Sequence, residues 1–200
     1  MPADHDISER VYVALKGDLI NGRLGSGRLQ TGRLQDGYQS SVTPIRETLL
    51  RLVGEGLLEM PTTGGFVQPR LSSERVRDLY AATQALLLAA ISWDSSMSPP
   101  ADVPAAESGL QPPIDVLMEE IVSRTGNFVL VAAVRSLNDR MRRIRRAETR
   151  RLAGIEREFT LFELQFRHGD RAALRRAVIA YHRRRLRHLS EIIAEIAASG

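Results

Sequence analysis

Apolar side chains recur along the first 22 residues at the spacing of a single helical face. Val11, Leu15 and Leu19 follow one another every four residues, which predicts a helix that buries this face. Asp6 is suited to cap the start of this helix, and the Asn-Gly pair at 21–22 is suited to end it.

Two further helices and a hairpin are predicted before residue 70. Leu34 and Tyr38 are spaced to lie on one side of a short helix over residues 31–38. Pro44 suits the first turn of the next helix. The buried face of that helix is formed by Ile45, Leu49, Leu52 and Val53. The short apolar runs "LLEM" and "FVQ" around "PTTGG" then predict a two-stranded β-hairpin, because glycine accepts the backbone angles of tight turns.

Three helices followed by a hairpin form a winged helix-turn-helix. In this arrangement the second helix of the motif enters the major groove of DNA with its N-terminal residues, and the hairpin touches the flanking backbone as a wing. We expect DNA contacts from Ser41, Thr43, Arg46, Arg33, Thr62, Thr63 and Gly64. For Arg46 there is an alternative, in which it pairs with Glu47 or Glu55 within the protein.

The rest of the chain is predicted to be all-helical. Ser72 and Ser73 are suited to cap a first helix, and a last helix is expected from the capping Asp170 to near Ala198. Three helices are expected between them, and a Pro/Ser-rich loop is expected over 92–113. The sequence thus predicts a mostly α protein with two domains. They are a winged helix-turn-helix DNA-binding domain over 1–71 and an all-α bundle over 72–200 for effector binding and dimerisation.

Composition excludes several classes of protein. The chain has no cysteine, so it has neither disulfides nor thiolate metal sites. The longest weakly polar run, over 79–91, is too short to cross a membrane, and the polar N-terminus does not resemble a signal peptide. We therefore expect a cytoplasmic protein without a membrane partner. Neither a P-loop, a dinucleotide fingerprint nor a paired-carboxylate site is visible, so we do not expect an enzyme.

Positive charge is concentrated in the last third of the sequence. Residues 128–200 carry 17 arginines and 8 acidic side chains, whereas residues 1–70 carry 8 basic and 8 acidic side chains. The clusters "RMRRIRR", "TRR" and "HRRRLRH" have two interpretations. They form a surface or site for an anionic partner, or they are solvated helix faces whose arginine stems cover apolar surface.

The segment "SVTPIRETLLRLVGEGLLE", with "TTGGFV" after it, resembles the GntR family of bacterial transcription regulators. The resemblance spans residues 7 to about 70. It implies a dimeric DNA-binding regulator, a repressor that responds to a small-molecule effector. The sequence departs from the family pattern at Val42, where the family often has an arginine. An alternative is therefore a protein–protein interaction module whose head has lost its affinity for DNA.

The second half resembles the FCD effector domain that often follows this head, in "SSERVRDLY", "RTGNFVL" and "FRHGDRAALRRAVIAYH". The resemblance implies a buried metal held by an aspartate and three histidines. The matching positions here are Ile114, Met118, Phe159 and His182, of which only His182 is a ligand type. We therefore predict no metal and no cofactor, either a dry, collapsed pocket or an apolar effector, and His182 as the candidate effector contact.

Overall fold

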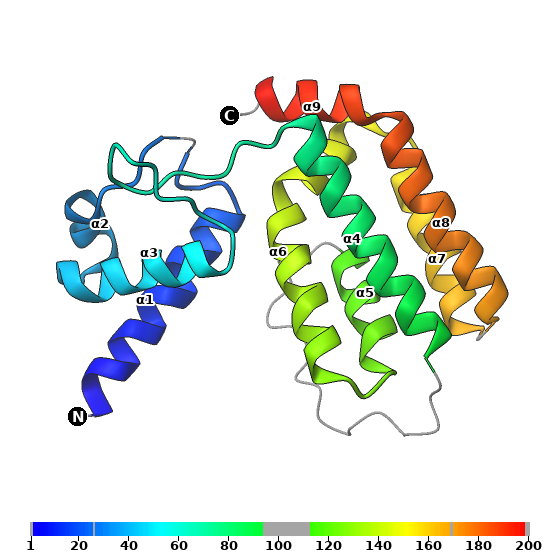
Figure 1. The fold of residues 1–200 in the computed structure, drawn as a ribbon, viewed down its shortest axis with the longest axis horizontal. Coiled ribbons are helices and arrows are strands. Elements are labelled where there is room, and N and C mark those ends of the chain that lie inside the picture. The colour runs from blue at the N-terminus through cyan, green and yellow to red at the C-terminus, as the bar shows by residue number, and fades with distance from the viewer. Residues whose placement is uncertain (1, 26, 94–112, 169, 199–200) are drawn as a thin grey trace. The chain divides into compact units, whose positions relative to one another are not determined.

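The structure is a computed structural model that describes residues 2–25, 27–93, 113–168 and 170–198. Helices make up most of the described chain, so the predicted mostly α class is confirmed (Figure 1). The chain divides into two compact units, Met1–Arg70 and Leu71–Ser199. Among the described helices, none is both long and apolar enough to cross a membrane.

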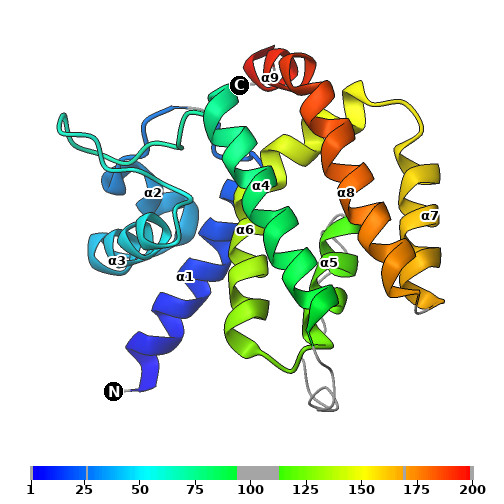
Figure 2. The same cartoon turned by 45° about the vertical axis from the view of Figure 1, so that its right-hand side comes forward.

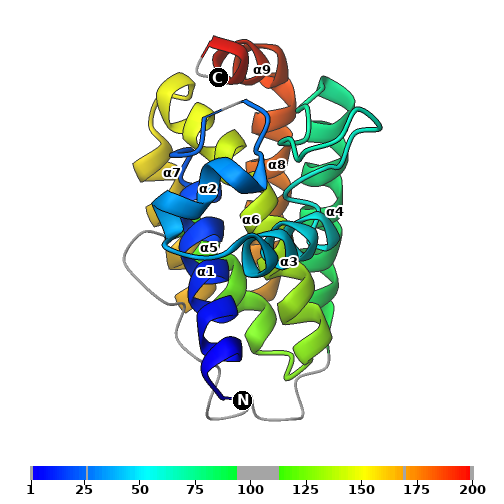
Figure 3. The same ribbon diagram turned by 90° about the vertical axis from the view of Figure 1, so that its left-hand side faces the viewer.

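The N-terminal unit contains α1 (Pro2–Ile20), α2 (Thr31–Tyr38) and α3 (Val42–Gly54). α3 lies across α1, as Figure 3 shows. Their apolar faces form one core with Val11, Leu15, Leu19, Leu34, Ile45, Leu49 and Leu52 buried. The buried faces predicted from the spacing are therefore confirmed. The start of α1 is different: the helix begins at Pro2, a favourable first helical residue, so Asp6 lies inside α1 and is not its cap.

The predicted β-hairpin is not formed as two strands in the part of the chain that the structure describes. Two isolated antiparallel bridges are present instead, Glu59 with Val67 and Leu29 with Phe66. Leu57 and Leu58 are both buried, so the side chains before the turn do not alternate as they would in a regular strand. The result is a short loop over 61–65, fastened on one side to the connector between α1 and α2.

The C-terminal unit is a helical bundle. It contains α4 (Ser73–Ser92), α5 (Pro113–Ser123), α6 (Phe128–Arg151), α7 (Ile155–Arg167), α8 (Arg171–Arg187) and α9 (Leu189–Ala198). The helices α4 to α8 pack along one another, and α9 crosses one end of them (Figures 1 and 2). Ser72 caps α4 by accepting the Arg75 N–H, and Asp170 caps α8 by accepting two backbone N–H groups, as predicted.

The prediction of a single long helix from 170 to near 198 is wrong. The helix ends near His188, whose N–H contacts the carbonyl oxygens of Arg184 and Arg185, and α9 begins in a new direction. The bend lets Leu189 and Ile192 pack with residues of α4 and α6 and close the end of the core. The predicted Pro/Ser-rich loop over 92–113 lies almost entirely outside the described residues.

Candidate nucleic-acid interface and buried polar network

The N-terminal end of α3 presents three of the predicted DNA contacts. Ser41 is the N-cap residue, and its hydroxyl makes no capping hydrogen bond. Thr43 and Arg46 are exposed on the side opposite the buried Ile45 and Leu49. The first N–H groups of a helix lack intrahelical partners and carry positive partial charge. This end of α3 can therefore accept an anion such as a phosphate.

Arg46 forms no hydrogen bond or ion pair with any residue that the structure describes. The alternative in which it pairs with Glu47 or Glu55 is therefore wrong for the described residues. Glu55 accepts hydrogen bonds from the Tyr12 hydroxyl at 2.8 Å and from Lys16 Nζ at 2.9 Å. Arg51 lies over the ring of Tyr12, with 3.4 Å between Cζ and the ring centroid. These contacts hold α1 against the C-terminal half of α3 and leave the Arg46 guanidinium available to a partner.

Acidic side chains of the N-terminal unit are mostly paired away from this end of α3. Glu9 pairs with Arg51 at 2.8 Å, and Asp18 pairs with Arg23 at 3.0 Å. Glu47 is exposed beside Arg46 and is the nearest acidic residue along α3. Many of the acidic side chains that make this unit neutral overall therefore lie in ion pairs on other faces, away from the N-terminal end of α3.

The other predicted contacts lie on separate elements of the same unit. Arg33 is exposed on α2, and Thr62 and Gly64 are exposed in the loop. Thr63 is held by Arg28, which donates to its carbonyl oxygen at 2.9 Å and to its Oγ1 at 2.7 Å. Within the described chain, no hydrogen bond or ion pair joins these residues to Ser41, Thr43 or Arg46.

The sequence did not indicate a role for Arg28, because it belongs to a Gly-Arg-Leu repeat that was interpreted as a plain connector. Its side chain packs over Gly65, which has φ +72°, and a Cβ at Gly65 would come within 2.8 Å of the Arg28 side chain. Glycine is therefore required at 65 for both its backbone angle and its lack of a side chain. The fixed loop presents Thr62 and Gly64 to solvent.

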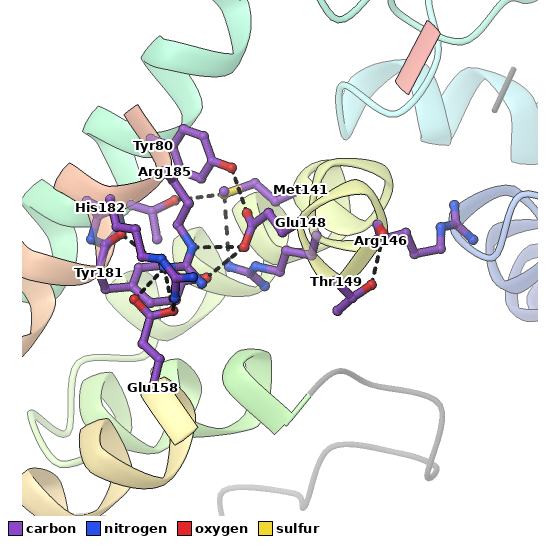
Figure 4. A network of polar contacts seen from close by, with 12 residues as sticks. Tyr80, Met141, Arg146, Glu148, Thr149, Glu158, Tyr181, His182 and Arg185 are labelled. Atoms are coloured by element: carbon purple, nitrogen blue, oxygen red, sulfur yellow. Dashed lines mark hydrogen bonds and ion pairs between the residues drawn. The ribbon is translucent and has the colours of Figure 1, made fainter. Parts of the chain in front are cut away.

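A network of buried charged groups lies in the interior of the C-terminal unit, between its apolar core clusters (Figure 4). Glu148 accepts hydrogen bonds from the Tyr80 hydroxyl at 2.6 Å and from Arg185 Nε at 2.8 Å. Arg185 also binds Glu158 and lies 3.3 Å from the ring centroid of Tyr181. Burial and the nearby carboxylate of Glu148 raise the pKa of Tyr181 to about 12, so this hydroxyl stays protonated near neutral pH.

Beside it, Asp115 is fully buried between two arginines. Arg142 Nε lies 3.0 Å from Asp115 Oδ2, and Arg145 contacts the other carboxylate oxygen. Arg145 also donates to the Asn138 side chain at 3.1 Å. Both interpretations of the arginine clusters thus miss Arg142, Arg145 and Arg185, which are buried and ion-paired. Charge counts along the sequence could not reveal acidic partners that lie 27 to 37 residues away, as Glu158 and Glu148 do from Arg185.

The metal that the resemblance implies does not fit these residues. Met118, at a histidine position of the resemblance, lies with its Sδ 3.3 Å from Arg145 Nη2. Phe159 packs against the apolar core, and Asp115 already neutralises two guanidinium groups. In the described residues, no three histidine or acidic side chains are grouped as metal ligands. A guanidinium therefore provides the buried positive charge here.

His182 is fully buried, and its Nδ1 donates to the carbonyl oxygen of Val178 at 2.8 Å. Its Nε2 has no hydrogen-bond partner in the described structure. Burial lowers the pKa of His182 to about 4, so the ring is neutral near pH 7. Its edge faces the rings of Tyr80 and Tyr181, with centroid separations of 6.4 and 5.0 Å.

A cavity of about 380 Å³ lies next to this network. Its walls combine apolar side chains, including Ile114, Ile155 and Phe159, with the polar Tyr181 and Arg185. His182 is not one of its lining residues. The pocket is not collapsed to an apolar contact, because the ion-paired Arg185 lies in its wall, and an apolar effector stays a prediction.

Comparisons with known proteins identify the fold. No protein-family model matches the sequence, and no curated protein matches it. A solved structure of E. coli McbR/YncC superposes with a TM-score of 0.69 at 20% identity, covering 92% of this chain and 97% of that one. A structure described as a transcriptional regulator GntR from Rhodococcus sp. RHA1 gives 0.71 at 15% identity, covering 96% and 98%. The chain shares the fold of GntR-family transcription regulators.

Proposed function

We propose that this protein is a DNA-binding transcriptional regulator of the GntR type, a dimeric repressor that responds to a small-molecule effector. The observation that carries the proposal is the exposed end of α3, where Ser41, Thr43 and Arg46 lie together and Arg46 has no partner among the described residues. The fold shared with GntR-family regulators supports it. A role as an enzyme is not part of this proposal.

In this proposal, residues 1–71 bind operator DNA in the cytoplasm. α3 enters the major groove, and the loop over 61–65 acts as the wing. Thr62, Thr63 and Gly64 of this loop lie near the DNA backbone, and Arg33 on α2 makes a further DNA contact. Residues 72–200 dimerise and bind the effector. The cavity beside Tyr181 and Arg185 is the proposed effector site, since its volume of about 380 Å³ is in the range of small-molecule pockets. His182 does not line this cavity but contacts the ring of Tyr181, so it acts on a ligand only through Tyr181.

The test is binding of the full chain to a labelled duplex from the region upstream of its own gene, over a series of salt concentrations. Affinity is expected to fall linearly with salt on a log–log plot, because phosphate contacts release counterions. An unrelated duplex of the same length is the control. Equal, weak binding to both duplexes at every salt concentration would contradict the proposal and favour the alternative of a protein–protein interaction module.

A further inference from the structure

Two exposed aliphatic side chains flank Arg46 on the outer face of α3. Val42 is 43% exposed and Leu50 is 41% exposed, although both belong to a helix whose opposite face is fully buried. Val42, Arg46 and Leu50 follow one another every four residues, so they lie on one stripe of the helix surface. Along this stripe of α3, an apolar side chain is followed by the cationic Arg46 and then by a second apolar side chain.

This stripe matches the chemistry of the major groove. A guanine presents two acceptors to an arginine there, and a thymine presents its C5-methyl group, which apolar side chains contact. Four residues of a helix span about 6 Å, so a helix that lies along the groove spans close to two base-pair steps of about 3.4 Å over this distance. Valine at position 42 can make no hydrogen bond with its side chain, so a methyl group is the base feature it can recognise.

We propose that Val42 reads a thymine methyl group about two base pairs from the base pair that Arg46 contacts. This inference rests on the proposed function and makes it more specific. Valine at this position favours thymine at one base pair of the DNA site. The positive charge of Arg46 and the phosphates of DNA supply the attraction that brings this face to the duplex.

An exposed valine is common on protein surfaces and needs no partner. The chain offers a matched control for this case, because Val13 on α1 is 55% exposed. Val42→Ala and Val13→Ala remove the same atoms from exposed sites. Both variants are expected to keep the melting temperature of the parent protein. An unchanged melting temperature would show that a change in DNA binding does not result from a change in folding.

The experiment first selects duplexes that bind the full chain from a random library. Each thymine of the selected site is then replaced in turn by deoxyuridine, which removes only the C5-methyl group. We expect one such replacement to weaken binding about fourfold, the effect of uncovering one apolar carbon. Val42→Ala is expected to cancel this loss at that position, whereas Val13→Ala leaves it unchanged.

The possible outcomes separate the two proposals. If a site is selected and binds with a normal salt dependence, but no deoxyuridine effect depends on Val42, the methyl contact is refuted and the regulator function stands. If selection enriches no duplex, both proposals are refuted. A deoxyuridine effect that Val42→Ala cancels at one position supports both.

Discussion

Arg185 and Glu148 form an ion pair inside the C-terminal unit, with 2.8 Å between Nε and Oε2 and both side chains at most 3% exposed. The same carboxylate accepts the hydroxyl of Tyr80. One glutamate on α6 therefore joins α4 and α8, at a place where helical bundles usually have apolar packing. Because both charges are removed from water, each depends on the other.

Loss of either partner is expected to destabilise the fold strongly. Glu148→Leu leaves the Arg185 guanidinium buried with less compensating charge and should lower the free energy of unfolding by about 3–5 kcal/mol. The double variant Glu148→Leu/Arg185→Met should be more stable than Glu148→Leu. Urea denaturation measures all three proteins. Arg151→Ala, which breaks an ion pair of a half-exposed arginine, is the control and should cost about 1 kcal/mol or less.

Stability should fall as the pH is lowered past the range where His182 titrates. Its folded-state pKa of about 4 lies below the ordinary value of 6.5, so the folded protein binds fewer protons than the unfolded chain between these values. The contribution is fully present above about pH 6.5 and is lost as the pH falls to about 4, a loss of up to about 3 kcal/mol.

The measurement is urea denaturation of the parent protein and His182→Gln across this pH range. The variant should have a shallower dependence on pH, since it lacks the titrating ring, even if it is less stable at pH 7. His168→Gln makes the same replacement at an exposed histidine and is the matched control. Identical slopes for the parent and His182→Gln would show that the buried ring does not titrate as inferred.

Protein purified without chelator is expected to contain well below one bound metal ion per chain by elemental analysis. A chelator should leave the melting temperature unchanged, because Arg142 and Arg145, not a metal, neutralise Asp115. Asp115→Asn should lower the melting temperature by removing the counterion of both arginines. A stoichiometric metal that is lost in His182→Ala would contradict this prediction.

The sequence predicted well what depends on neighbouring residues. The faces of α1 and α3 follow from spacing alone, and the caps Ser72 and Asp170 follow from short-range hydrogen bonding. The two-stranded hairpin was wrong because Leu57 and Leu58 are both buried, so the run before the turn does not alternate as a strand, and Phe66 also bridges to Leu29, 37 positions away. The buried arginines were missed because their partners are also distant in the sequence.

The candidate DNA contacts were only partly predictable. The polar edge of α3 could be found because its opposite face has a clear apolar period, whereas Arg28 could not, since its role depends on how close it lies to Thr63 and Gly65. The bend at His188 lets Leu189 and Ile192 close the end of the core. Their packing partners are distant in sequence, so no local pattern indicates the bend.

The predicted homodimer has a specific surface to test. Exposed Ile179 on α8 lies among Arg176, Arg183 and Arg187, so pairing this face with its own copy would bring like charges together. Leu161 and Leu164 are exposed three residues apart on α7, and Arg167 beside them is paired with Glu120 and Glu163. We expect Leu161→Glu/Leu164→Glu to convert a dimer of the full chain to a monomer by light scattering.

Ile179→Glu is the matched control for this experiment, because it also places a charge on an exposed aliphatic position of the same unit. It should leave the dimer intact. Dissociation by Ile179→Glu and not by the α7 variant would place the interface on α8. A parent protein that is monomeric at tens of micromolar would contradict the dimer itself.

Arg46 is expected to contribute the largest single share of DNA affinity. It is exposed in the first turns of α3 and has no intramolecular partner in the described structure, so no ion pair must be broken before it binds. If it contacts a guanine edge, Arg46→Ala should cost about 1–3 kcal/mol and relax specificity at one base pair. If it contacts a phosphate, affinity should fall equally for all sequences, with a shallower salt dependence.

Fluorescence anisotropy with the selected duplex and with single-base variants of it distinguishes these two modes. Glu47→Ala is the control, since it alters the neighbouring exposed residue and removes a negative charge that repels phosphate, so binding should be unchanged or slightly tighter. Arg46→Ala should keep the parent melting temperature because the side chain makes no hydrogen bond or ion pair with the residues that the structure describes. A lower melting temperature with unchanged affinity would mean that Arg46 is a structural residue, and the assignment of α3 as the DNA-reading helix would lose its principal support.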